Sequence, residues 1–313
     1  MIHFIARRLV SGVILLVVIT TVAYTLLYLG GGDIARRLLG VSATQATVDL
    51  KAAELGLDRG LPEQYIGWVG NALQGDLGRS WFTGQLVATG ISSRVLVTLS
   101  IVVIAMLLSA LISAALGVLA AVRGGWLDRV VQVGATLGIA VPPFLIALAL
   151  VFVFAVSIPL FRATGYVPPT TSVSGWVASI TLPVVALVIG TVATVTQQVR
   201  GSVSEVLERD FVRTLRSRGL RFPRVVFVNV LRTAGGAPLA VLTVQFVSLL
   251  GGAVIIEQVF ALPGLGQLAI QATTNGDIPL VMGLVLVTAV MVVVVNLLID
   301  LLQAALNPKV RLS

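Results

Sequence analysis

The stretch VLVTLSIVVIAMLLSALISAALGVLAAV, residues 95–122, contains no charged side chain. About 20 consecutive apolar residues are enough for a helix to cross the hydrocarbon core of a membrane. Five other stretches reach that length without a charge: Leu9–Leu29, Val130–Leu160, Trp176–Val199, Thr233–Ile256 and Ile278–Ile299. The sequence therefore predicts an all-α integral membrane protein with six transmembrane helices.

The composition supports a lipid-embedded chain. Of the 313 residues, 57% are hydrophobic and 11% are charged, whereas about a quarter of the residues in a soluble domain are charged. The first apolar stretch is longer than the apolar core of a typical signal peptide and is read as a retained helix. The chain has no cysteine, which excludes disulfides and thiolate metal sites.

Basic residues in the short connections predict the orientation, because such residues concentrate on the cytoplasmic side. The two chain ends and the connection between the second and third stretches carry Arg7, Arg8, Arg123, Arg129, Lys309 and Arg311, and the connection 200–232 carries eight arginines. The short connections on the opposite side carry only Arg162. Both termini are predicted to be cytoplasmic. Residues 1–94 would form a transmembrane helix with a long external segment, and residues 95–313 a core of five transmembrane helices.

Several function classes lack the residues that they need. The six stretches hold no ionisable side chain, which ion-coupled carriers require at membrane depth, so a secondary carrier is disfavoured. The single histidine is His3, no catalytic set can be assembled, and no Gly-Lys pair of a phosphate-binding loop occurs. We expect no enzymatic activity, metal or cofactor on this chain, and an energy source on another polypeptide.

Prolines interrupt three of the predicted spans. Pro142 and Pro143 lie in the third, Pro183 in the fourth and Pro238 in the fifth. An interior proline removes a backbone hydrogen bond and kinks its helix. Such kinks either line a path through the membrane or serve as packing notches.

The connection 200–232 contains EVLERDFVRTLRSRGL, residues 205–220. Ser202 and Glu205 match a capping box, which predicts that a helix begins there. An apolar stripe at intervals of four follows, formed by Val203, Leu207, Phe211 and Leu215. Gly219 is expected at the C′ position that ends this helix, and Pro223 in the first turn of a second helix.

Three interpretations of this connection remain open. It could be a protruding hook for a cytoplasmic protein, a helix lying on anionic lipid, or a topology signal alone. Nucleic-acid binding is disfavoured, because no aromatic side chains interleave with the arginines and three acids dilute the charge.

Four stretches resemble the inner-membrane permease subunits of ATP-binding-cassette importers for dipeptides and oligopeptides. They are EVLERDFVRTLRSRGL (205–220), LGLDRGLPEQYIGWVGNALQGDLGRS (55–80), EQVFALPGLGQLAIQATTNGDIPLVMG (257–283) and NLLIDLLQAALNPKVR (296–311). The first is similar to the family's EAA loop, with Arg213, Thr214 and Leu215 at the Glu-Ala-Ala positions and Gly219 at the glycine. The resemblance covers nearly the whole chain.

The resemblance implies a type I importer fold in the bacterial inner membrane, with half of the transport pathway on this chain. It implies a coupling helix that docks on a separate ATPase, and the coupling residues would be Asp210, Arg213, Thr214, Leu215, Arg216 and Gly219. Other implied partners are a sister permease subunit, an external solute-binding protein, membrane lipid and the peptide substrate. ATP and magnesium would bind the ATPase subunits. Nickel, glutathione and haem importers are relatives with other substrates.

The external segment contains a predicted helix that Pro62 opens and Gly75 closes, with Ile66, Val69 and Leu73 on one face. This helix either packs across the external mouth and meets the solute-binding protein through Tyr65 and Trp68, or rests on the membrane surface.

Overall fold

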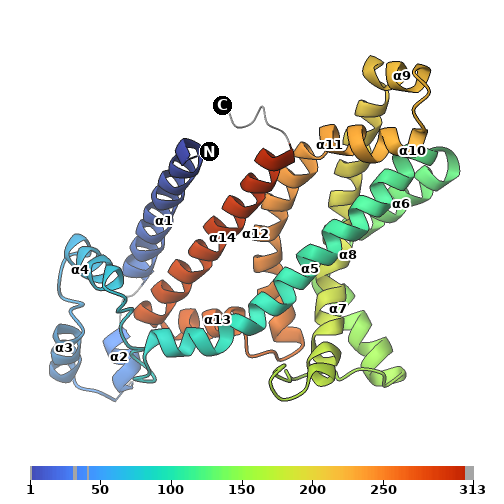
Figure 1. The fold of residues 1–313 in the computed structure, drawn as a ribbon. Coiled ribbons are helices and arrows are strands. Elements are labelled where there is room, and N and C mark those ends of the chain that lie inside the picture. Colours follow the sequence, from blue (N-terminus) through green and yellow to red (C-terminus); the bar gives the residue numbers. More distant parts are fainter. Residues whose placement is uncertain (1, 31–33, 41, 307–313) are drawn as a thin grey trace. The chain divides into compact units, whose positions relative to one another are not determined.

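The computed structural model describes residues 2–30, 34–40 and 42–306. Lys309 and Arg311, which contributed to the predicted orientation, and the end of the stretch 296–311 lie outside the described residues. The described chain is helical, and its one isolated β-bridge joins Arg79 to Leu86. The helices are shown in Figure 1.

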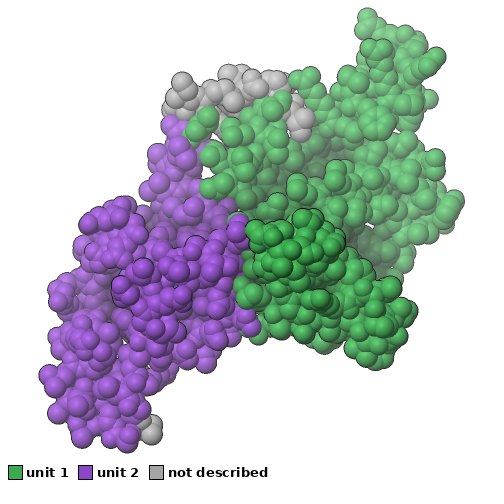
Figure 2. All heavy atoms as spheres, turned by 60° about the horizontal axis from the view of Figure 1, so that its bottom comes forward, with its two compact units in different colours: residues 1–5, 97–263, 294–313 green, residues 6–96, 264–293 purple. Residues whose placement is uncertain are grey.

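The chain forms two compact units, which Figure 2 colours separately. Unit 1 comprises residues 1–5, 97–263 and 294–313, and unit 2 comprises residues 6–96 and 264–293. Unit boundaries fall inside α5 (Val87–Arg123) and α14 (Ile278–Leu306). The predicted division after Arg94 stays a prediction.

Among the described residues, five helices are long and apolar enough to cross a membrane, and a bent pair can supply a sixth span. The five spans are Ile5–Gly30 in α1 (Ile2–Gly30), α5, α8 (Val173–Leu207), α12 (Gly236–Val259) and Ile278–Ala305 in α14. The bent pair joins α6 (Gly125–Ala140) to residues 143–157, with 94° between the two arms. The third predicted span is therefore not one straight helix.

The prolines explain only part of this geometry. Pro142 precedes α7 (Pro143–Val151), which continues as the π-helix η1 (Phe152–Ser157), so this Pro-Pro pair marks the break. By contrast, α8 is continuous through the buried Pro183. Pro238 lies in the first turn of α12, just after the break at Gly235 that separates α12 from α11, rather than in the interior of a helix.

In unit 1, α8 is the central helix, with α6, α7 and α12 packed against it. Two glycines permit close approach of its neighbours. A Cβ at Gly138 of α6 would lie 2.9 Å from the Ala193 Cβ of α8, and one at Gly117 of α5 would lie 2.7 Å from the Val199 Cβ. The helices therefore meet almost backbone to backbone at these points.

In unit 2, α13 (Leu265–Asn275) packs with the first parts of α5 and α14 around Val87, Leu268 and Leu284. The segment between the first two predicted spans forms α2 (Ile34–Leu39), α3 (Gln45–Glu54) and α4 (Leu61–Leu73). As predicted, Pro62 lies in the first turn of α4, and Gly75 follows its C-cap.

Candidate coupling surface at helix α9

The connection between α8 and α12 folds differently from the capping-box prediction. The helix does not begin at Ser202, because α8 continues through that residue to Leu207. The chain breaks at Glu208 and Arg209, and the separate helix α9 runs from Asp210 to Ser217. Arg209 has an extended backbone and occupies the N-cap position. Figure 1 shows α9 at one end of unit 1 and α7 toward the other end.

The apolar residues of α9 fasten it to unit 1. Val212 is buried in the core cluster that includes Val203 and Val225, and Leu215 packs against the same cluster. Burial of one valine side chain contributes roughly 1.5–3 kcal/mol. The predicted stripe is thus divided: Val203 and Leu207 belong to α8, Leu215 faces inward, and Phe211 is 37% exposed. It is not a protruding apolar edge.

The outward face of α9 is polar. The side chains of Asp210 and Arg213 are 96% and 78% exposed, and their ion pair at 3.8 Å is loose. Thr214 is exposed, and its hydroxyl donates to the Asp210 carbonyl oxygen at 3.0 Å. The surface defined by Asp210, Arg213 and Thr214, here called the α9 crest, is what α9 offers to a partner.

The end of α9 agrees with the glycine prediction. Gly219 has φ +83°, in the left-handed region, directly after the C-cap Arg218. The next helical run begins with α10 (Phe222–Arg224) and continues through the π-helix η2 (Val225–Val230) and α11 (Leu231–Ala234). The Arg216 guanidinium lies 5.3 Å from the Phe222 ring centroid, so Arg216 also braces this turn.

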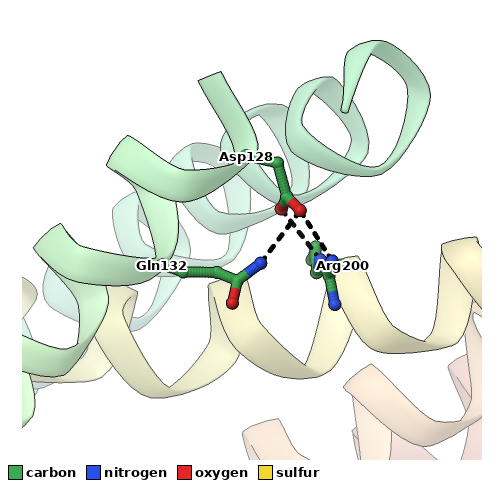
Figure 3. Close-up of polar contacts among 3 residues, drawn as sticks. All are labelled: Asp128, Gln132 and Arg200. Atoms are coloured by element: carbon green, nitrogen blue, oxygen red, sulfur yellow. Dashed lines mark hydrogen bonds and ion pairs between the residues drawn. The ribbon is translucent and has the colours of Figure 1, made fainter. Parts of the chain in front are cut away.

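An ion pair joins α6 to α8, and its arginine lies two turns before the end of α8. Figure 3 shows the residues involved. Arg200 donates from Nε to Asp128 Oδ1 at 2.9 Å and from Nη2 to Oδ2 at 2.7 Å. Gln132 Nε2 donates to the same Oδ2 at 2.9 Å. Asp128 and Gln132 belong to α6, so this network joins α6 to α8. In the sequence, Arg200 is one of eight arginines of the connection 200–232, and nothing in the pattern predicts its partner, although Asp128 is a single acid between Arg123 and Arg129.

The helices are longer than the charge-free stretches, and one acid inside them is fully buried. Glu257 is 0% exposed, close to the end of α12, and its Oε1 accepts a hydrogen bond from Thr98 Oγ1 at 2.5 Å. Asp300 lies within α14. Glu257 and Asp300 thus lie where these helices continue beyond the charge-free stretches 233–256 and 278–299.

Tyr65 and Trp68 point toward α1 rather than outward. The Tyr65 hydroxyl is 2.9 Å from Thr20 Oγ1 and accepts from Thr21 Oγ1 at 3.0 Å. Its ring meets that of Tyr24 edge-on at 5.5 Å and stacks with Trp68 at 6.3 Å. The large apolar residues of α4 that are exposed are Ile66 and Leu73, whereas Tyr65 and Trp68 are half-buried.

Pro238 and residues of the run 222–235 line an apolar cavity of about 720 Å³ within unit 1. The walls come from α5, α8, the run 222–235 and α12, and include Ala114, Val199, Phe227, Pro238 and Leu242. The pathway candidates Pro142, Pro143 and Pro183 are not among its lining residues. The described residues contain no group of three or more acidic or histidine side chains that could hold a metal ion.

Comparison with known proteins places this geometry in a family. The model "Binding-protein-dependent transport system inner membrane component" matches residues 113–312, and the model of its N-terminal part matches residues 1–102. A probable peptide ABC transporter permease of Sinorhizobium fredii is 34% identical over 98% of this chain and 99% of that protein. A glutathione transport system permease of Pectobacterium atrosepticum is 32% identical over 99% of each chain.

A solved structure shares the fold. The MetNI methionine ABC transporter, in an inward-facing conformation, matches with a TM-score of 0.56 over 69% of this chain and 96% of that chain, at 20% sequence identity. The multi-pass helical architecture, the separate helix α9 and these full-length similarities lead to one conclusion: the chain belongs to the inner-membrane components of binding-protein-dependent ABC transport systems.

Proposed function

We propose that this chain is the permease subunit of an ATP-driven importer for dipeptides or oligopeptides and forms half of the transport pathway. Support comes from relatives named as peptide permeases that match at about a third identity over the full chain, such as one of Brucella abortus at 35%. Family membership implies a binding protein and an ATPase as partners. A sister permease would supply the other half of the pathway.

The observation that supports ATPase coupling is the α9 crest. A helix of only eight residues is fixed to unit 1 by Val212, and it presents Asp210, Arg213 and Thr214 outward. Because α9 is packed against the rest of unit 1, a displacement of the α9 crest would be transmitted to α8. In this proposal the α9 crest docks on the ATPase, ATP and magnesium bind there, and this chain carries no cofactor and hydrolyses no nucleotide.

Uptake by the reconstituted assembly tests the proposal. The chain, a sister permease, the ATPase and the binding protein would be placed in liposomes, and uptake of a labelled dipeptide measured with and without ATP. We expect concentrative uptake that needs ATP and every subunit. Concentrative uptake by this chain alone, or uptake driven by an ion gradient without ATP, would contradict the proposal.

The substrate is a separate question with one specific alternative. Because one full-length relative is a glutathione permease, glutathione should be tested beside dipeptides and longer peptides in the same liposomes. Preference for glutathione would correct the substrate and leave the importer mechanism in place. Uptake of nickel or haem but of no peptide would overturn the substrate class.

A further inference from the structure

The ion pair between Arg200 and Asp128 differs from the surface pairs nearby. Glu205–Arg209 and Asp210–Arg213 join residues three or four positions apart and are well exposed. Arg200 and Asp128 are 72 positions apart, lie on different helices, and have side chains 35% and 15% exposed. Their two parallel hydrogen bonds fix both the distance and the angle between the two side chains, whereas a single hydrogen bond would leave the angle free.

The helix that carries Asp128 lies between two joints. At its start, Gly124 and Gly125 have φ values of +60° and +62°, so the turn from α5 uses backbone conformations open mainly to glycine. At its end, Val141 and Pro142 separate α6 from α7 with a 94° bend. Regular helical hydrogen bonding is therefore interrupted at both ends of α6.

Side-chain packing constrains α6 strongly, and against α8. Near the Pro142 joint, Gly138 lets α6 approach Ala193 of α8 closely. Near the glycine joint, the Asp128–Arg200 pair, supported by Gln132, holds the other end. Helix α5 also lies close to the same turn of α8, because a Cβ at Gly117 would lie 3.0 Å from the Arg200 backbone nitrogen.

Arg200 stands seven positions before Leu207, where α8 ends and α9 follows. We propose that the Asp128–Arg200 pair is a positioning link that makes α6 move with α8, so that displacement of α9 reaches the broken span α6–α7. Arg200 and Asp128 would act through helix position and would touch neither the ATPase nor the substrate. This inference rests on the proposed coupling function of α9.

The test uses the complete assembly in liposomes and measures two rates, ATP hydrolysis and substrate uptake. Asp128→Asn removes the charge but keeps the size, and Arg200→Lys keeps the charge but lacks the planar fork that donates two parallel hydrogen bonds. In Asp128→Asn we expect ATP hydrolysis and ATPase attachment to persist while uptake per ATP falls roughly tenfold. A tenfold fall corresponds to about 1.4 kcal/mol of coupling free energy, which is within the range seen for residues that couple two sites. Arg200→Lys should show a smaller fall.

Two controls separate the link from a purely structural role. Glu205→Gln breaks an exposed pair on the same helix, and its uptake per ATP should equal that of the unmodified assembly. Since the chain lacks cysteine, Asp128→Cys combined with Arg200→Cys can be joined specifically by a short bismaleimide. The unjoined double variant should be uncoupled, and joining should restore uptake per ATP.

Three outcomes would overturn the inference. They are unchanged uptake per ATP in Asp128→Asn, a parallel loss of hydrolysis and uptake, and a joined double variant that stays uncoupled. If Asp128→Asn does not accumulate in the membrane, Arg200→Lys and the joined variant decide. Failure of the importer proposal is distinct, because the unmodified assembly itself would then show no ATP-driven uptake.

Discussion

Gly219 shows how a single residue sets the course of the chain after α9. Its φ of +83° allows the chain to leave α9 and turn back into α10. No atom outside its neighbours lies within 4 Å of a Cβ built there, so the requirement at this position is conformational and not steric.

Gly219→Val should therefore abolish or strongly reduce uptake while membrane insertion stays normal. The left-handed conformation costs an L-residue about 1–2 kcal/mol, and a β-branched residue tolerates it poorly. Gly219→Asn is the matched control, because asparagine adopts this conformation readily, and it should keep most of the uptake. Normal uptake by the valine variant, measured beside its amount in the membrane, would contradict the geometry proposed for α9.

At the scale of one element, α9 has an inner face that fastens it and an outer face that is free. Charge reversal on the outer face should affect docking and leave the fold alone. We expect Arg213→Glu to weaken co-purification of the ATPase. Reversal of Arg216 should weaken it too, through its contact with Phe222. Arg59→Glu is the matched control for Arg213→Glu, since Arg59 is also exposed and pairs loosely with Glu63 at 3.6 Å. Unchanged co-purification of the Arg213→Glu variant would favour a role in topology only.

The packing of α6 on α8 gives a second test at this scale. Gly138→Ala would place a Cβ 2.9 Å from that of Ala193, whereas Gly134 of the same helix has no atom within 4 Å of such a Cβ. Overpacking of this kind costs typically 1–3 kcal/mol. Thermal unfolding in detergent should show a lower midpoint for Gly138→Ala and an unchanged or higher midpoint for Gly134→Ala. Equal midpoints would show that α6 does not lie tightly against α8.

For the whole molecule, the bent pair decides the topology. Between α4 and α9 the chain passes through α5, the pair α6–α7 and α8. If the bent pair crosses the membrane, α4 and α9 lie on opposite sides, and if it re-enters on the side from which it came, they lie on the same side. The basic residues of the connection 200–232 predict the first arrangement.

Single cysteines can measure this directly, because the chain has none of its own. Ser217 in α9 and Asn71 in α4 are both exposed. The two variants are therefore Ser217→Cys and Asn71→Cys. In intact cells, a membrane-impermeant maleimide should label the cysteine at 71 and not the one at 217, and in inside-out vesicles the labelling should reverse. Labelling of both from one side would show a re-entrant pair and would exclude six complete spans.

The local features of this fold could be predicted from the sequence. The apolar stretches identified the membrane class and the approximate spans, because the hydrophobic length that a bilayer requires is a property of each segment alone. Pro62 at the start of α4 and Gly219 after α9 were also predicted correctly, because a fixed φ or a left-handed φ is a property of one residue.

The tertiary structure decided the features that depend on distant residues. No glycine or proline marks the break at Glu208 and Arg209. The capping-box motif at Ser202 is overridden because α8 continues there along the core, and Val212 then anchors α9 separately. Likewise Tyr65 turns inward to α1, and Arg200 meets Asp128 across 72 positions. Sequence alone determined which segments are helical and apolar. Only packing decided where a helix breaks and which charges form ion pairs. The free energy of such contacts comes from residues that are far apart in the sequence, and the local sequence pattern does not show which of them will meet.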